Sequence, residues 1–472
     1  MTSPRGTPTA IGLRSERGPV LLALMVTTGL IAIDATILAT AVPTIVEDLG
    51  GFSSFPWLFS IYLLTQAVSV PIYSKLADTI GRKPVVLLGI GLFALGSVLC
   101  GFAWSMPALI AFRAVQGLGA GAVQPMAITI AGDIYTLAER SKVQGYIASV
   151  WGASAVVGPT LGGLFSEFAT WQWIFFVNVP LAALAAWLLV RSFHETVERS
   201  PHRIDWAGGL LLTVSLSLLL LALLEGGRAW AWVSVPSLGA FGLGAALLAA
   251  FVLAERRAPE PVLPLWVLSR RLLGTTALVG LGVGVILMGI TTYVPTVLET
   301  LVGVSPLVSG LTLATLTIGW PISASQSGRV YLRLGFRTTV LIGCGVTVLG
   351  TAGLALAATN PSVVGIGAAC FVVGLGLGFV AAPSLIAAQA SVEWGERGVV
   401  TGANMFARSI GSAVGVAAIG ALVNGILQGQ SATAAPDLFA DAAAAAFAAV
   451  LLAAVGTTAA ALALPRDGRP PG

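Results

Sequence analysis

Residues 19–45 read PVLLALMVTTGLIAIDATILATAVPTI, an almost unbroken apolar run with one charged residue, Asp34. A helix that crosses a bilayer needs about 20 mainly apolar residues, and this run is long enough. The run is too long for the apolar core of a secretory signal, which has about 7 to 15 residues, although Arg5, Arg14 and Arg17 precede it. It therefore predicts a first membrane span.

The rest of the chain has the same character. Of the 472 residues, 56% are hydrophobic and 9% are charged, whereas a soluble domain is about 45–50% apolar and about 25% charged. A bilayer accommodates this excess of apolar residues, so we expect an all-α polytopic membrane protein. Fourteen transmembrane helices are predicted, at 19–45, 57–73, 85–103, 106–127, 144–165, 173–191, 207–224, 235–254, 272–298, 307–326, 338–358, 362–383, 399–425 and 441–464.

Basic residues fall in alternate loops. With the N-terminus inside, all of the 24 Lys and Arg except Arg113, Arg228 and Arg408 lie in segments predicted to be cytoplasmic, which retain such residues. We therefore expect both termini to be cytoplasmic. The Ala, Gly and Arg content favours a bacterial inner (plasma) membrane. The basic residues form short scattered clusters, so no nucleic-acid partner is expected.

Asp34 lies well inside the first predicted span, where an ionised carboxylate costs at least a few kcal/mol unless it is neutral, paired or hydrated. A site that alternates between burial and a nearby cation would let this carboxylate bind and release a proton. The structural alternative is a permanently protonated or hydrogen-bonded aspartate. Intramembrane ionisable groups are usually functional, which favours a role in proton coupling.

Two arginines also lie within predicted spans. Arg113, in the fourth span, lies at a depth close to that of Asp34 and cannot lose its charge. We predict that it couples to Asp34, directly or through water; the alternative is that it binds only backbone carbonyls. Arg408, in the thirteenth span, contacts the substrate or ties helices together, and the sequence does not separate these roles.

Two further motifs contain glycine, proline or charged residues that indicate a local structure. The turn after the second span reads SKLADTIGRKP, residues 74–84, where Gly81 suits a tight turn and Asp78, Arg82 and Lys83 offer ion pairs between helix ends. On charge alone such a run is a topology anchor. The fifth span contains GPTLGG, residues 158–163, which predicts either a bend or a tight-packing seam.

No pattern of residues indicates an enzyme or a metal site. His194 and His202 lie in one predicted loop, and no Cys, His or acidic cluster has metal-ligand spacing. Cys100, Cys344 and Cys370 all lie in apolar runs, so they are expected to pack as small hydrophobes. We expect no cofactor.

Five motifs, in this order, resemble the major facilitator superfamily, and specifically its fourteen-span drug:proton antiporter family (EmrB/QacA-like). They are DATI (34–37) with PTI (43–45), SKLADTIGRK (74–83), RAVQGLGAG (113–121), GASAVVGPTLGG (152–163) and WQWIFFVNVP (171–180). The sequence departs from the family's pattern at Ser74, where glycine is usual, and at Thr79, where a basic residue is usual.

The resemblance implies two six-helix bundles that flank two inserted helices and rock about a central cavity. The parts are a cytoplasmic N-terminus (1–18), an N-terminal bundle (19–191), a linker with the inserted helices (192–271), a C-terminal bundle (272–464) and a cytoplasmic tail (465–472). It also implies proton coupling by Asp34 and Arg113 and a monomeric protein. An inner latch is implied for Asp78, Gly81, Arg82 and Lys83, and an outer closure for Gly158, Pro159, Gly162 and Gly163.

The predicted function is proton-driven export of amphipathic small molecules, with the proton gradient as the energy source. Asp34 is the only carboxylate predicted deep within a span, which favours neutral or monocationic substrates. The alternatives are a dedicated exporter of one metabolite, antibiotic, amino acid or lipid, a proton-coupled importer, and a membrane scaffold that transports nothing. Residues expected to face the substrate cavity are Tyr62, Gln66, Gln116, Trp151, Tyr293, Trp320, Asn404 and Arg408.

Overall fold

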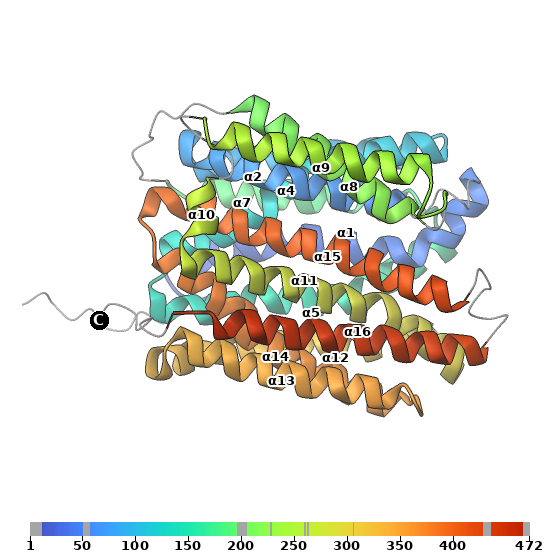
Figure 1. Cartoon of the computed structure of the whole chain (residues 1–472). Helices are drawn as coiled ribbons and strands as arrows, with labels where there is room; N and C mark the ends of the chain where they lie inside the picture. The colour runs from blue at the N-terminus through green and yellow to red at the C-terminus, as the bar shows by residue number, and fades with distance from the viewer. Residues whose placement is uncertain are drawn as a thin grey trace, which may run out of the picture.

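The computed structural model describes residues 12–50, 57–195, 205–226, 229–258, 261, 264–304, 306–427 and 436–465. These residues are almost entirely helical, and the long helices run side by side (Figure 1). The predicted all-α polytopic fold is confirmed.

The chain forms an N-terminal half, an intervening helix pair and a C-terminal half. The N-terminal half comprises α1 (Gly18–Leu49), α2 (Trp57–Ile80), α3 (Arg82–Gly101), α4 (Met106–Ile134), α5 (Leu137–Phe168), α6 (Trp173–Phe176) and α7 (Asn178–Ser192). The intervening helices are α8 (Trp206–Glu225) and α9 (Val235–Glu255), followed by the short α10 (Leu265–Ser269). The C-terminal half comprises α11 (Arg271–Val297), the π-helical turn η2 (Leu298–Val302), α12 (Pro306–Leu334), α13 (Phe336–Ala357), α14 (Val363–Ala390), the 3₁₀ turn η3 (Trp394–Glu396), α15 (Arg397–Leu427) and α16 (Pro436–Leu462).

Every predicted span coincides with one of these helices or helix pairs. In the described part, 11 helices are long and apolar enough to cross a bilayer by length and composition. Three predicted spans, at α5, α8 and α12, are not among them; the apolar part of α8, Ala207–Leu223, is shorter, and α5 and α12 carry more polar and charged residues. The total of fourteen spans stays a prediction.

The span predicted at 173–191 coincides with one apolar stretch long enough to cross a bilayer, Trp173–Ser192, in which the helix is interrupted once. The structure separates α6 from α7 at Val177. Pro180 has no N–H to donate to the carbonyl of Phe176, so the helical ladder is interrupted at this point. The break makes Asn178 the first residue of α7.

The two halves have separate hydrophobic cores. Buried Leu30, Phe93 and Met126 belong to the core of the N-terminal half, and Ile286 and Val373 belong to that of the C-terminal half. The pair α8 and α9 packs beside α2 and α15, through a cluster whose buried members include Leu64, Leu212, Phe251 and Ala403. Each half therefore has a buried core of its own.

Small residues let helix backbones approach closely within the C-terminal half. A Cβ atom added at Gly374 or Gly378 would collide with the backbone of α12, and one added at Gly376 would lie 2.5 Å from the amide nitrogen of Thr347 in α13. Residues four apart share a helix face, so α14 presents Gly374 and Gly378 to α12 and Gly376 to α13.

Candidate functional site

A buried carboxylate lies at the centre of the N-terminal half. Asp34 comes from the middle of α1, and the side chains of Asp34 and Arg113 are each only 1% exposed. Arg113 and Gln116 occupy one face of α4, three residues apart, while Ser97 comes from α3 and Asn178 begins α7. We call these five residues the carboxylate cluster.

Asp34 accepts hydrogen bonds from three side chains. Arg113 Nη1 donates to Asp34 Oδ2 at 2.8 Å, and Gln116 Nε2 and Asn178 Nδ2 donate to Asp34 Oδ1 at 2.8 and 2.9 Å. An ionised carboxylate is an acceptor only, so this arrangement suits the charged form. The predicted coupling of Asp34 to Arg113 is a direct ion pair in this conformation.

Arg113 is held by more than its partner carboxylate. Its Nη1 also donates to Gln116 Oε1 at 2.6 Å, and its Nε donates to the Leu58 carbonyl at 3.2 Å. Its guanidinium lies 4.2 Å from the ring centroid of Tyr62. The alternative that Arg113 binds only backbone carbonyls is therefore wrong. Removing two charges from water is costly, and these added contacts offset part of that cost.

The sequence does not predict two members of this cluster, Ser97 and Asn178. Ser97 Oγ accepts from Gln116 Nε2 at 2.8 Å, so it orients the amide that faces Asp34. The Oδ1 atom of Asn178 is buried without a hydrogen-bond partner in the described part of the chain. The signal for Asn178 in the sequence is its place in the WQWIFFVNVP motif, which contains one other amide, Gln172.

A second charged cluster lies where α2, α4 and α15 end or begin. Arg82 forms ion pairs with Asp78 at 3.0 Å and with Asp133 at 3.2 Å, and its guanidinium lies 3.7 Å from the ring centroid of Trp394. Arg397 pairs with Asp133 at 3.4 Å. We call Asp78, Arg82, Asp133, Trp394 and Arg397 the latch cluster, and this end of the bundle the latch end.

The latch cluster joins the two halves. Asp78, Arg82 and Asp133 belong to the N-terminal half, whereas Trp394 and Arg397 belong to the C-terminal half. Arg82 Nη2 also donates to the Trp394 carbonyl at 3.3 Å. The bundle is therefore held together at the end that the charge distribution predicts to be cytoplasmic. The sequence motif contains only Asp78 and Arg82 of this set, so the cross-half partners were not predicted.

Two other residues of the predicted latch have local roles. Gly81 has a φ of 104°, which favours glycine, and forms the turn between α2 and α3. Lys83 does not pair with Asp78; its Nζ donates to the carbonyls of Val190 and Phe193 at 3.0 and 2.6 Å. In return, Glu195 accepts from the backbone N–H of Arg82 at 2.7 Å. Lys83 thus ties α3 to the end of α7.

An apolar layer lies between the halves, near the latch cluster. Val70, Ile128, Leu385 and Met405 form one buried cluster, with Phe406 packed against it. These side chains come from α2, α4, α14 and α15, so each half contributes two helices. We call this layer, in which side chains of both halves pack together, the apolar plug.

A further ion pair outside the predicted spans ties the start of α1 to α5. Arg17 Nη1 lies 3.0 Å from Glu139 Oε2 and donates to the Ile134 carbonyl at 3.1 Å. Partial burial opposes ionisation of Glu139, but its hydrogen bonds with Thr136 and the charge of Arg17 hold the pKa of Glu139 below its ordinary value. The pair fixes the start of α1 against the turn between α4 and α5.

The glycine-proline motif of the fifth span is a packing seam. Helix α5 is continuous through this motif, and a Cβ atom added at Gly158 would collide with Thr36 of α1. The Thr36 hydroxyl donates to the Ser154 carbonyl at 2.9 Å, which joins the same two helices. Gly162 is buried, and the contacts of Pro159 and Gly163 lie outside the described side chains. The outer-closure role of this motif stays a prediction.

The predicted cavity residues do not form one group. Tyr62 and Gln116 are buried at the carboxylate cluster, and Asn404 is buried and donates to the Thr276 carbonyl at 3.0 Å. Tyr293 is buried in the core of the C-terminal half. The half-buried members of the set are Gln66, Trp151, Trp320 and Arg408.

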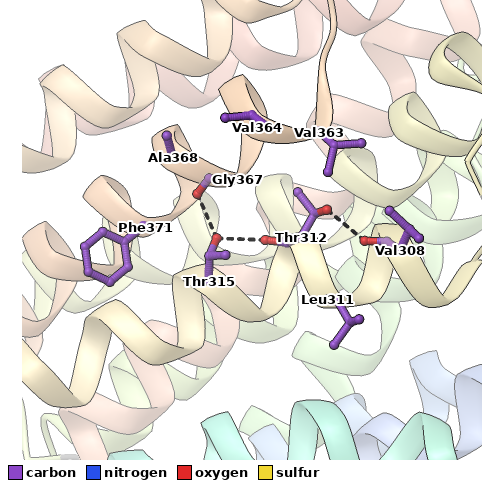
Figure 2. Close-up of a pocket in the computed structure, with 9 residues that line it drawn as sticks. All are labelled: Val308, Leu311, Thr312, Thr315, Val363, Val364, Gly367, Ala368 and Phe371. Carbon is purple, nitrogen blue, oxygen red and sulfur yellow. Dashed lines mark hydrogen bonds between the residues drawn. The ribbon is translucent and has the colours of Figure 1, made fainter.

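A groove of about 490 Å³ lies between α12 and α14. Figure 2 shows that its two threonine hydroxyls donate hydrogen bonds to backbone carbonyls of the protein. Thr312 donates to the Val308 carbonyl, and Thr315 donates to the carbonyls of Thr312 and Gly367. The remaining lining is apolar, and none of the predicted site residues lines it. This groove is separate from the carboxylate cluster. Among the described residues, no group of three His, Cys, Asp or Glu is placed to hold a metal ion.

Comparison with known proteins gives a consistent family. The model of the Major Facilitator Superfamily matches residues 24–416. The chain is similar to the multidrug transporter protein MdtP of Bacillus subtilis (strain 168), with 35% identity over 413 residues, 88% of this chain and 76% of the relative. It is also similar to multidrug resistance protein 3 of the same organism, with 34% identity over 403 residues, 85% of this chain and 78% of the relative.

A solved structure has a similar fold. The crystal structure of the human organic anion transporter MFSD10 aligns with a TM-score of 0.66 and 16% identity, over 93% of this chain and 99% of that one. At this identity the likeness concerns the fold alone.

Proposed function

Because the chain belongs to the Major Facilitator Superfamily, in which its relatives are named as multidrug transporters, it is a multi-pass efflux transporter rather than an enzyme, and we propose that it works as a proton-coupled antiporter. Within the superfamily we assign it to the fourteen-span drug:proton antiporters. The observation that carries this proposal is the ion pair of Asp34 and Arg113, buried among helices α1, α4 and α7.

Protonation of Asp34 changes the hydrogen bonds and ion pair that the carboxylate cluster can form. The charged carboxylate satisfies Arg113, Gln116 and Asn178 at once. A neutral carboxylic acid offers no charge to Arg113, which must then find another anion, a carbonyl or water. The two protonation states of Asp34 therefore favour different packings of these helices. Proton binding can drive a conformational change only through a difference of this kind between the two states.

Helices α2 and α4 connect the carboxylate cluster to the latch cluster. Arg113 and Asp133 both belong to α4 and are twenty residues apart, about 30 Å along a helix. Tyr62, beside Arg113, and Asp78, beside Arg82, both belong to α2. A shift of either helix at Asp34 is thereby transmitted to the ion pairs that join the halves.

The transport cycle follows from these two clusters. In the conformation described here the latch end is closed, and we assign it to the cytoplasmic side. Asp34 takes a proton from outside, the halves rock so that the latch cluster opens, and the proton leaves inward as substrate binds. Each net elementary charge moved inward gains roughly 2.3 kcal/mol per 100 mV of membrane potential, so one proton suffices for appreciable export of a neutral substrate, whereas one-for-one exchange with a monocation is driven by the pH gradient alone.

The remaining properties follow from the sequence. We propose that the protein is a monomer in a bacterial inner membrane, with both termini cytoplasmic and no cofactor besides the proton gradient. Its substrates are amphipathic small molecules, neutral or monocationic overall, because Asp34 is the only carboxylate deep within a predicted span.

Uptake into inverted membrane vesicles tests this function. The probes are ethidium, a lipophilic cation, and a panel of neutral fluorescent amphiphiles, offered with and without an imposed pH gradient that is acidic inside. We expect wild-type vesicles to accumulate several probes only when the gradient is present. The Asp34→Asn variant should accumulate them at least about tenfold more slowly.

The control is Asp441→Asn, which makes the same chemical change at an exposed position of α16 and should transport like wild type. Uptake that is the same with and without the gradient would contradict proton coupling. If only one probe of a varied panel is transported, a dedicated exporter replaces multidrug export.

A further inference from the structure

Arg408 is a cation that has no counter-ion among the described residues. It follows Arg397, the first residue of α15, by eleven residues, so it lies about 16 Å into the bundle from the latch end. A guanidinium carries five N–H donors and stays charged in proteins. Within the part of the chain that the structure describes, the Arg408 side chain makes no hydrogen bond, ion pair or ring contact.

The other arginines within the bundle differ from Arg408 in this respect. Arg113 pairs with Asp34, and Arg82 and Arg397 both pair with Asp133. An unpaired charge at this depth costs several kcal/mol unless water or a ligand solvates it. Some buried side-chain nitrogen and oxygen atoms of the described residues have no hydrogen-bond partner, but none of them belongs to Arg408. The Arg408 residue is half-buried. Its guanidinium therefore reaches accessible space rather than a closed pocket.

The position of Arg408 on α15 places it on an inward face. Asn404, one turn earlier, bonds to the Thr276 carbonyl of α11, and Ser412, one turn later, contacts the Gly284 carbonyl of the same helix. Met405, three residues before Arg408, belongs to the apolar plug between the halves. Residues three and four apart share a helix face. Arg408 thus lies between α11 and the space between the halves, just beyond the plug from the latch end.

We propose that Arg408 binds an ionised acidic group of the transported molecule. A guanidinium fork matches carboxylate, sulfonate and phosphate groups through two parallel hydrogen bonds. Such a ligand supplies the counter-ion that no described side chain supplies. The inference rests on the proposed export function and narrows its substrate class to amphiphiles that carry one acidic group and are neutral or monocationic overall, such as zwitterions.

A matched pair of dyes tests this binding site. Rhodamine 110 carries a free carboxylate, and rhodamine 123 is its methyl ester, so the two differ in one acidic group. Binding of each dye to the purified protein is measured by fluorescence anisotropy, without any proton gradient. We expect wild type to bind rhodamine 110 at least about tenfold more tightly than its ester, because a charge-assisted bidentate contact is worth that much.

Three variants show whether the guanidinium of Arg408 causes the difference in affinity between the two dyes. Arg408→Gln should weaken rhodamine 110 at least about tenfold and change rhodamine 123 less than about threefold. Arg408→Lys keeps the charge but not the fork, so its affinity for rhodamine 110 should be intermediate. Arg329→Gln removes the same charge from an exposed position on α12 and should bind both dyes like wild type.

Several results would overturn the assignment. They are equal wild-type affinity for the two dyes, no binding of rhodamine 110 by wild type, or an equal loss for both dyes in Arg408→Gln that Arg408→Lys restores. The last result assigns Arg408 to helix packing. Binding is measured apart from transport, so failure of proton-driven uptake with intact dye selectivity would reject only the proposed function.

Discussion

The contacts of Arg113 explain why an arginine occupies this position. Its guanidinium reaches Asp34, the Gln116 side chain and the Leu58 carbonyl from one planar group. The ring of Tyr62 covers one face of that group. A buried ion pair is weak support for stability, because desolvation offsets much of the Coulombic gain. The geometry instead suits a group that fixes the position of Asp34 relative to α4 and α2.

Arg113→Lys tests this geometry at constant charge. Lysine presents a single ammonium on a flexible chain, so it cannot bridge the same acceptors in fixed directions. We expect gradient-driven dye uptake to fall at least about tenfold, with the protein still present in the membrane at wild-type amount. Initial uptake rates and immunoblots of the same vesicles measure both quantities. Uptake within about twofold of wild type would mean that charge alone is sufficient at this position.

At the residue scale, the sequence alone identifies the charged members of the carboxylate cluster and misses two of its neutral members. Asp34 and Arg113 could be predicted because a charged side chain within an apolar membrane segment raises the free energy of the folded protein unless it is paired or hydrated. Asn178 and Ser97 could not, because neutral polar side chains are much cheaper to bury and occur in many spans. The sequence identifies Gln116 as a cavity residue, whereas it is fully buried and donates to Asp34. Its place in the cluster depends on which face of α4 meets α1.

At the scale of elements, the latch cluster depends on helix ends brought together by the fold. The motif at residues 74–84 predicts ion pairs of Asp78 with Arg82 and Lys83 between helix ends, and the structure contains the pair of Asp78 and Arg82. It does not predict Trp394 or Asp133, because their contacts with Arg82 join distant parts of the chain. Asp133 is central to this junction, because it pairs with Arg82 of its own half and with Arg397 of the other.

Asp133→Asn should open the latch end. Loss of this carboxylate leaves Arg82 and Arg397 without their shared partner, and a difference of about 1.4 kcal/mol shifts a two-state equilibrium tenfold. We expect a cysteine placed in the apolar plug by Leu385→Cys to react about tenfold faster with an impermeant maleimide in inverted vesicles. Asp441→Asn, with the same added cysteine, is the control. Equal labelling rates in the two variants would show that Asp133 does not hold the halves together.

At the scale of the whole molecule, the halves meet along a few helices and keep separate cores. Helix α5 packs against α12 so closely that a Cβ atom added at Gly145 would lie 2.6 Å from the Ser325 Cβ. Across the interface, α2 packs against α15, as the contact of Gly402 with Ser74 shows. In the proposed transport cycle, rocking about these two contacts exposes the central space to one side at a time while each core stays intact.

The overall architecture could be predicted because a bilayer requires long apolar segments of similar length. The positions of all fourteen predicted spans follow from this requirement, and each coincides with helix in the structure. Which helices face one another could not be predicted in this way, because α14 is apolar on every side and gives no preferred face. The closed latch end is likewise a property of tertiary packing, since it depends on side chains from α2, α3, α4 and α15 together.

Proton movement during export tests the central claim most directly. Purified protein is reconstituted in liposomes, and internal pH is recorded while a transported dye is added under an imposed pH gradient. Wild type should discharge the gradient faster when the dye is present, and Asp34→Asn should show no dye-dependent discharge although it is folded. Dye-dependent discharge by Asp34→Asn at the wild-type rate would contradict coupling through the buried carboxylate.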